Sequence, residues 1–189
     1  GDGGVFVADR SNKAALENVS LVVNEGAVLG SFIAVESGAS ADIFGGSIGD
    51  FFEAGPGGAI TVHGGTVGSV RSEGGEVTIF GGNVSCVVNR PEGSGVIHGG
   101  LIRGALTRGQ LTILGGRHLG TQFFRSGGRI EFVATAATLD GEPIDAMTGE
   151  TIEVTERDSA ELRVTLAGGL PIATRLFRPE ITVELTFVS

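Results

Sequence analysis

The 189-residue sequence contains no tryptophan, no tyrosine, one methionine and only five prolines. Trp and Tyr are the rings on which bound sugars usually stack, so an aromatic sugar platform of that kind is excluded. The single cysteine, Cys86, cannot form an internal disulfide, and its apolar surroundings at 84–88 favour a buried small hydrophobe over a reactive thiol. No apolar run approaches the about 20 residues that a membrane helix needs, and no signal peptide is recognisable. We therefore expect no membrane insertion.

Positive charge is also scarce, because 13 Lys and Arg face 22 Asp and Glu and the net charge is −9. With a pI of about 4.8, this composition argues against general nucleic-acid binding and favours a soluble, self-repelling surface. The chain begins at Gly1 without an initiator methionine, so we expect it to be a mature or excised part of a longer protein.

Glycine is abundant, with 34 residues, but it follows no three-residue period, which excludes collagen. Val, Ile, Thr and Phe are frequent, whereas long helix-forming runs are scarce. We therefore predict an all-β fold whose glycines lie in turns.

A glycine doublet recurs behind a short apolar strand in five places. Its first glycines are separated by 19, 17, 18 and 16 residues, which is a loose repeat. A unit of this size holds strands too short to bury an apolar side alone, so the units must stack. The five motifs are IFGG (43–46), VHGG (62–65), IFGG (79–82), IHGG (97–100) and ILGG (113–116).

The repeat predicts a parallel β-helix in which each unit is one coil and each glycine pair is a corner, where neighbouring coils crowd any Cβ. A less repetitive unit before the first doublet is expected to belong to the same array. A β-meander or sandwich with recurring hairpin turns is the alternative. The solenoid is favoured because apolar and turn positions repeat together. Two inward columns follow, formed by Val67, Val84 and Ile102, and by Ile60, Val77 and Leu111.

The character of the chain changes after residue 133, where the glycine pairs lose their spacing. Alternating apolar and polar residues predict half-buried strands at 151–155, 160–166 and 181–188. We assign residues 1–133 to the β-helix with its N-terminal cap and 134–189 to a terminal coil with a hairpin-rich cap, all within one domain. A cap is needed because an open solenoid end would recruit another chain.

The glycine-doublet corners and the periodicity over residues 19–133 resemble right-handed parallel β-helices of the pectin-lyase-like superfamily. The resemblance implies a secreted, extracellular or cell-surface protein of bacterial origin, and a carbohydrate-active or adhesive role. The coils of 16–19 residues are shorter than is usual there. No catalytic residue can be carried over, because the Trp- and His-bearing signatures of the lyase families are missing.

Acidic residues are few in the coils, but Glu53 and Glu73 occupy similar places in successive units, with Asp50 near. Such carboxylates could hold calcium, as a pectate-lyase-like site would require. We favour a solvated turn and predict no metal or other cofactor. His63 and His98 precede equivalent glycine pairs, without the acidic or Cys neighbours of a metal site. Phe51–Phe52 and Phe123–Phe124 should each turn one ring outward.

Arginines cluster between residues 90 and 129, where six of them against Glu92 give +5, leaving −14 for the remainder. Arg90, Arg108 and Arg125 fall in the variable segments of three successive units, with His98 and His118 close to the corners. A ladder of guanidiniums could bind the carboxylates or sulfates of an anionic polysaccharide. The alternative is a basic face balanced by nearby glutamates.

Together these features predict a non-catalytic binding or structural module of a larger secreted protein, with an anionic polysaccharide or a cell-surface partner as its ligand. The alternative is a polysaccharide lyase or glycoside hydrolase acting on an anionic glycan; whether the chain is an enzyme stays open, with the balance against it. A third possibility is a purely structural role, in which uncovered coils stack into oligomers.

Overall fold

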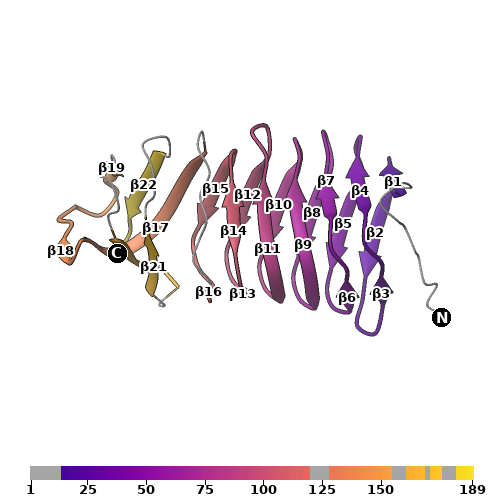
Figure 1. Ribbon diagram of the computed structural model, residues 1–189, viewed down its shortest axis with the longest axis horizontal. Helices are drawn as coiled ribbons and strands as arrows, with labels where there is room; N and C mark the ends of the chain where they lie inside the picture. The colour runs from indigo at the N-terminus through magenta and orange to yellow at the C-terminus, as the bar shows by residue number, and fades with distance from the viewer. Residues whose placement is uncertain (1–13, 120–127, 155–160, 169–170, 176–181) are drawn as a thin grey trace.

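The computed structural model describes residues 14–119, 128–154, 161–168, 171–175 and 182–189. Every regular element in those ranges is a strand, which confirms the all-β prediction. The strands form a row of stacked coils that ends in a cap (Figure 1). In the described part of the chain, no helix is long and apolar enough to cross a membrane.

Each coil has three sides built from short parallel strands, so the predicted parallel β-solenoid is confirmed, with about six turns. Side one consists of β2 (Ser20–Val23), β5 (Ser40–Ile43), β8 (Ala59–Val62), β10 (Glu76–Ile79), β12 (Ser94–Ile97) and β15 (Gln110–Ile113). Side two consists of β3 (Val28–Leu29), β6 (Ser47–Ile48), the first part of β9 (Thr66–Ser72), the first part of β11 (Asn83–Asn89), β13 (Leu101–Ile102) and β16 (Arg117–His118). Side three consists of β1 (Ala14–Glu17), β4 (Ile33–Glu36), β7 (Phe52–Ala54), the second parts of β9 and β11, and β14 (Ala105–Thr107).

Strand register defines the length of each coil on side one. Ser40 pairs with Ala59, Ala59 with Glu76, Glu76 with Ser94 and Ser94 with Gln110, so these coils contain 19, 17, 18 and 16 residues, as the doublet spacing predicted. A coil of 20 residues precedes them, since Ser20 pairs with Ser40. The less repetitive unit before the first doublet therefore belongs to the solenoid.

The interior is filled by apolar columns that run through the stack. Val67, Val84 and Ile102 are in register and fully buried, as predicted. The second predicted column is also buried, but between Val77 and Leu111 it contains Gly95. The side chain of Asn89 fills the space that a Cβ on Gly95 would occupy, and its amide donates to the carbonyl of Gln110 at 2.7 Å.

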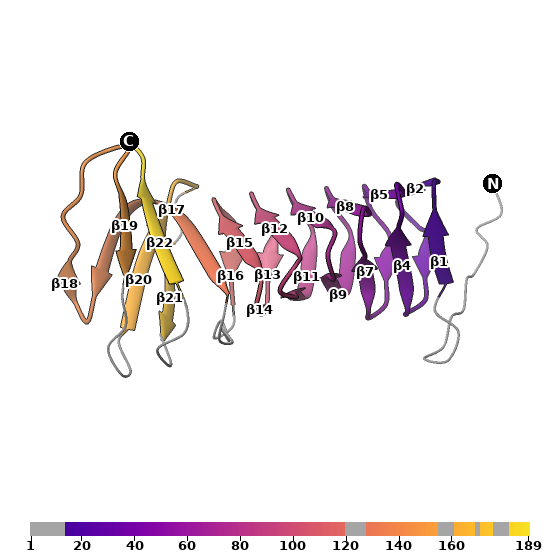
Figure 2. The same cartoon turned by 90° about the horizontal axis from the view of Figure 1, so that it is seen from above.

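The cap extends the sheet of side one. β17 (Arg129–Leu139) begins parallel to β15 and β22 (Thr182–Phe187) and then pairs antiparallel with β20 (Glu161–Leu166). Residue 133, where the sequence analysis ended the β-helix, lies inside this strand. The remaining cap strands are β18 (Glu142–Pro143), β19 (Thr151–Val154) and β21 (Pro171–Arg175), of which β21 forms an antiparallel pair with β20. Figure 2 shows this group at the end opposite the N-terminus.

Candidate functional site

In the described part of the chain, one residue of each coil occupies the same position at the outer edge of side three, and we call this set of residues the charged column. Glu17 pairs with Glu36 in register. Further along, the backbone N–H of each column residue donates to the carbonyl of the residue that directly precedes its column neighbour on the coil before. The pairs are Gly55 to Val35, Glu73 to Ala54, Arg90 to Ser72 and Arg108 to Asn89. The charged column is therefore Glu17, Glu36, Gly55, Glu73, Arg90 and Arg108.

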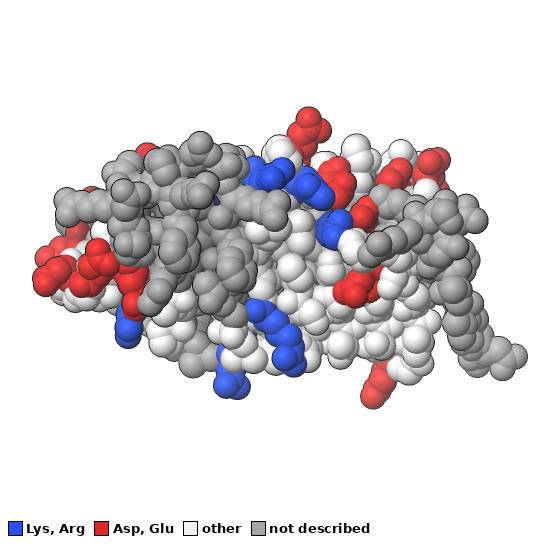
Figure 3. All heavy atoms as spheres, in the orientation of Figure 1, with Lys and Arg blue, Asp and Glu red and all other residues white. Residues whose placement is uncertain are grey.

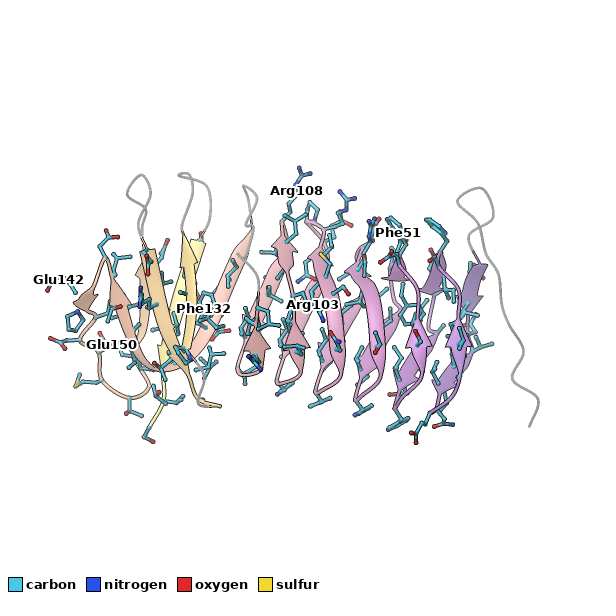
Figure 4. The ribbon with its side chains drawn as sticks, turned by 60° about the horizontal axis from the view of Figure 1, so that its bottom comes forward. Phe51, Arg103, Arg108, Phe132, Glu142 and Glu150 are labelled. Carbon is cyan, nitrogen blue, oxygen red and sulfur yellow. The ribbon has the colours of Figure 1, made fainter. Side chains whose placement is uncertain are left out.

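Two of the three arginines expected to form a ladder thus occupy neighbouring places. Arg90 and Arg108 are exposed at successive positions of the charged column, about 4.8 Å apart along the stack. Arg108 projects from the outer tip of its coil (Figure 4). Arg125 lies outside the described residues, so the third member of the predicted ladder has no structural description.

An ion-pair network connects the middle of the charged column to the face of side three. Arg90 Nε donates to Glu73 Oε1 at 3.3 Å. Arg71 Nη1 lies 3.9 Å from the same oxygen and 3.8 Å from Glu53 Oε1. The Glu53 side chain is only 9% exposed, whereas that of Arg90 is 45% exposed, so the network runs from a buried end to a solvated one. Arg71 is the residue of this network that the sequence analysis missed.

Arg71 is held by an aromatic stack with an unusual backbone. Its guanidinium carbon lies 4.0 Å from the centre of the Phe51 ring, and Phe51 stacks on Phe32 at 4.7 Å. Both phenylalanines have positive φ, 62° and 66°, which is a strained conformation for a bulky side chain. Each is one extra residue in its coil at this corner. Ile48 pairs with Val67 and Phe52 with Val70, so the segment that contains Phe51 is one residue longer than its counterpart in the next coil. Phe52 points inward, as one ring of the doublet had to.

The predicted neighbourhood of Glu53 and Glu73 is therefore occupied by a cation of the chain itself. The two carboxylates share Arg71, whose guanidinium fills the place where calcium was considered. In the ranges that the structure describes, no three His, Cys, Asp or Glu side chains gather as metal ligands would. A shallow hollow of about 310 Å³ adjoins the network and is lined by Glu73, Arg90, Pro91 and Glu92.

The glycine doublets form the corner between sides one and two, and an alternating ring ladder covers that corner. His63 stacks on Phe44 at 4.5 Å and on Phe80 at 5.4 Å, and Phe80 stacks on His98 at 4.5 Å. Asp42 Oδ1 lies 3.7 Å from His63 Nε2, so the expectation that His63 has no acidic neighbour was wrong. Because the rings are nearly parallel, each ring of the ladder covers a face of its neighbour. These two histidines are thus part of a structural stack.

His118 lies close to the last glycine doublet, as the sequence analysis expected, with its Nε2 3.2 Å from the carbonyl oxygen of Gly115. His118 occupies the inward column next to Ile102, and burial lowers its pKa below the ordinary value. Cys86 is half-buried, and burial raises the pKa of its thiol, which disfavours the reactive thiolate. The second predicted doublet, Phe123–Phe124, lies outside the described residues.

Charge is unevenly distributed over the face that carries the network. Basic side chains gather over the middle coils, whereas acidic ones lie toward the N-terminal coils and over the cap (Figure 3). No family model, no curated protein and no solved structure matches this chain. The family resemblance therefore has no support beyond the coils themselves, and what stands is a parallel β-solenoid with a charged edge.

Proposed function

We propose that this chain is a non-catalytic binding module whose ligand is an anionic polysaccharide held along the charged column. The observation that carries the proposal is the adjacency of Arg90 and Arg108, exposed at the same position of successive coils. Their backbones lie on adjacent coils about 4.8 Å apart, and each planar guanidinium can donate two hydrogen bonds to one carboxylate or sulfate. Glu73 offsets part of the charge of Arg90, so Arg108 supplies most of the attraction.

We further infer that the module belongs with right-handed β-helices of the pectin-lyase-like kind and acts outside the cell or at its surface. The support is the coil architecture with glycine corners in every clear unit. An experimental structure would test the hand of the coil, and fractionation of the producing cell would test the location.

Retention on immobilised polygalacturonate, alginate and a sulfated glycan tests the proposed ligand. We expect binding at low salt that weakens as salt rises, because the attraction is ionic. Arg108→Ala should reduce retention severalfold. Arg163→Ala removes the same charge from the cap, where Arg163 pairs with Glu161, and should leave retention unchanged. Absent retention at low salt, or equal losses in the two variants, would overturn the proposal.

A catalytic role, as a polysaccharide lyase or glycoside hydrolase, is the second candidate. It is favoured by one observation, the convergence of Glu53 and Glu73 on Arg71 beside the hollow. A carboxylate near an arginine could serve proton transfer next to an acidic sugar. Release of an unsaturated product, followed by ultraviolet absorbance with and without calcium, separates a lyase from a binder, and release of reducing sugar detects a hydrolase. If neither product forms on any of the three glycans, this candidate should be abandoned.

A further inference from the structure

The charges of the charged column are sorted along the solenoid axis. Its first two positions are Glu17 and Glu36, and its last two are Arg90 and Arg108. Like charges therefore occupy adjacent strands at both ends, an arrangement that costs free energy within one chain. In the described residues, Glu17, Glu36 and Arg108 form no ion pair, whereas Arg90 pairs with Glu73.

Sorted charge becomes complementary when the column meets a reversed copy of itself. Numbered from the N-terminal coil, position one then faces position six, and position two faces position five. Glu17 would face Arg108 of the second copy, and Glu36 would face its Arg90. A two-fold axis parallel to the strands makes each contact twice, since the same surface serves both chains.

The neighbouring column of side three is largely buried within the chain. Its six positions are occupied by Ala15, Ala34, Glu53, Arg71, Val88 and Leu106, as the strand register shows. Ala34, Glu53 and Val88 of this column are only 0%, 7% and 9% exposed, so a second copy can meet the charged column but not this one. Glu53 and Arg71 already pair within one chain, so the discriminating contacts are those of the charged column.

We propose that two copies of this chain pair side by side and antiparallel along the outer edge of side three, held by the contacts Glu17–Arg108 and Glu36–Arg90. The complementary stretch spans five coil steps, or about 24 Å. One narrow face of this length buries less than a permanent dimer requires, so the association is weak and reversible. It is also salt-sensitive, because its specificity is ionic.

This proposal goes beyond the proposed ligand, but it uses the same arginines. A polyanion on Arg90 and Arg108 would displace Glu36 and Glu17 of the second copy. Binding of glycan should therefore dissociate the dimer. Self-association is measured without glycan and retention is measured on glycan, so failure of either proposal can be recognised separately.

Sedimentation equilibrium of the full chain at low and high salt tests the pairing. We expect the dimer dissociation constant to rise at least tenfold at high salt, as about 1.4 kcal/mol of ionic contact would produce. Arg108→Glu alone should raise it by a similar factor at low salt, since it sets Glu17 against a glutamate in both contacts.

Two double variants provide a matched comparison, because they have the same composition and the wild-type net charge. Glu17→Arg with Arg108→Glu exchanges two charges that face each other, so the dimer should remain within severalfold of wild type. Glu36→Arg with Arg108→Glu sets glutamate against glutamate and arginine against arginine, so self-association should be lost. Both keep the Arg90–Glu73 pair, and thermal unfolding checks that both are folded.

Three results would overturn the proposal. One is a wild-type chain that stays monomeric at low salt up to its solubility. Another is a dimer whose dissociation constant does not change with salt concentration. The third is equal behaviour of the two double variants, which would mean that charge is involved without the antiparallel register.

Discussion

Two corners of the same coils differ in how closely their residues repeat from one coil to the next. The corner at the glycine doublets repeats nearly the same residues from coil to coil and covers them with stacked rings, whereas the edge of side three changes from Glu to Arg along the stack. Both bend the chain against the previous coil: a Cβ on Gly65 or on Gly75 would meet backbone atoms at less than 3 Å. The difference shows that stacking restricts the backbone at each corner and leaves the outward side chains free to vary.

The largest effect is expected from a side chain at the doublet corner. A Cβ on Gly65, which has φ of +82°, would lie 2.7 Å from the Gly45 carbonyl carbon, so Gly65→Ala should lower the free energy of unfolding by about 3 kcal/mol or more. Gly26 has the same φ with nothing within 4 Å of its Cβ, so Gly26→Ala should cost only the about 1 kcal/mol of backbone strain. Urea unfolding measures both, and equal losses would refute the role of stacking.

The next largest effect should appear at the buried end of the ion-pair network. Arg71→Met leaves the carboxylate of Glu53 without its guanidinium neighbour in a nearly buried position and should cost about 2 to 3 kcal/mol. Arg90→Met removes the solvated ion pair and should cost less than about 1 kcal/mol. If chemical denaturation gave Arg90→Met the larger loss, the order of burial along the network would be wrong.

Smaller changes are expected in the ring ladder. Phe80 is 49% exposed but stacks on two histidines, so Phe80→Ala should lower stability by about 1 kcal/mol. Phe44 is similarly exposed, and the one ring contact described for it is with His63, so Phe44→Ala should cost about half as much. Thermal melts of the two variants compare them, and a neutral Phe80→Ala would mean that the ladder adds nothing to stability.

The smallest effect concerns pH at the last coil. Burial lowers the pKa of His118, so the unfolded chain binds a proton more readily than the folded one below the ordinary value of 6.5. Stability should therefore fall as pH drops through this range. His118→Leu should show a shallower decline. The measurement is denaturant unfolding from pH 7.5 to about pH 5, and parallel curves for the two proteins would contradict it.

Repetition made much of the fold predictable. Equivalent positions in successive units had to stack. The doublet corners, the coil lengths and the column of Val67, Val84 and Ile102 could therefore be inferred from the sequence. The position of Arg90 next to Arg108 followed from the same register. A repeat fixes which residues are neighbours along the stack, because parallel pairing is regular.

Contacts between sides of a coil were not predictable in this way. Two examples are the Asn89 side chain in the space next to Gly95, and Arg71 on the Phe51 ring between two glutamates. Both depend on side-chain directions that the repeat period does not determine. The outward turn of Phe32 and Phe51 arises from one extra residue per coil, which looked like a loose spacing in the sequence.

The sequence by itself determined a stack of parallel coils with glycine corners, because short apolar strands can be buried only by stacking and crowded bends exclude side chains. Only the tertiary structure decided how charge is ordered on the surface. Residues far apart in the chain, from Glu17 to Arg108, align into one column because each coil returns the chain to the same edge. That alignment places Arg90 next to Arg108, and these two arginines form the basic half of the charged column.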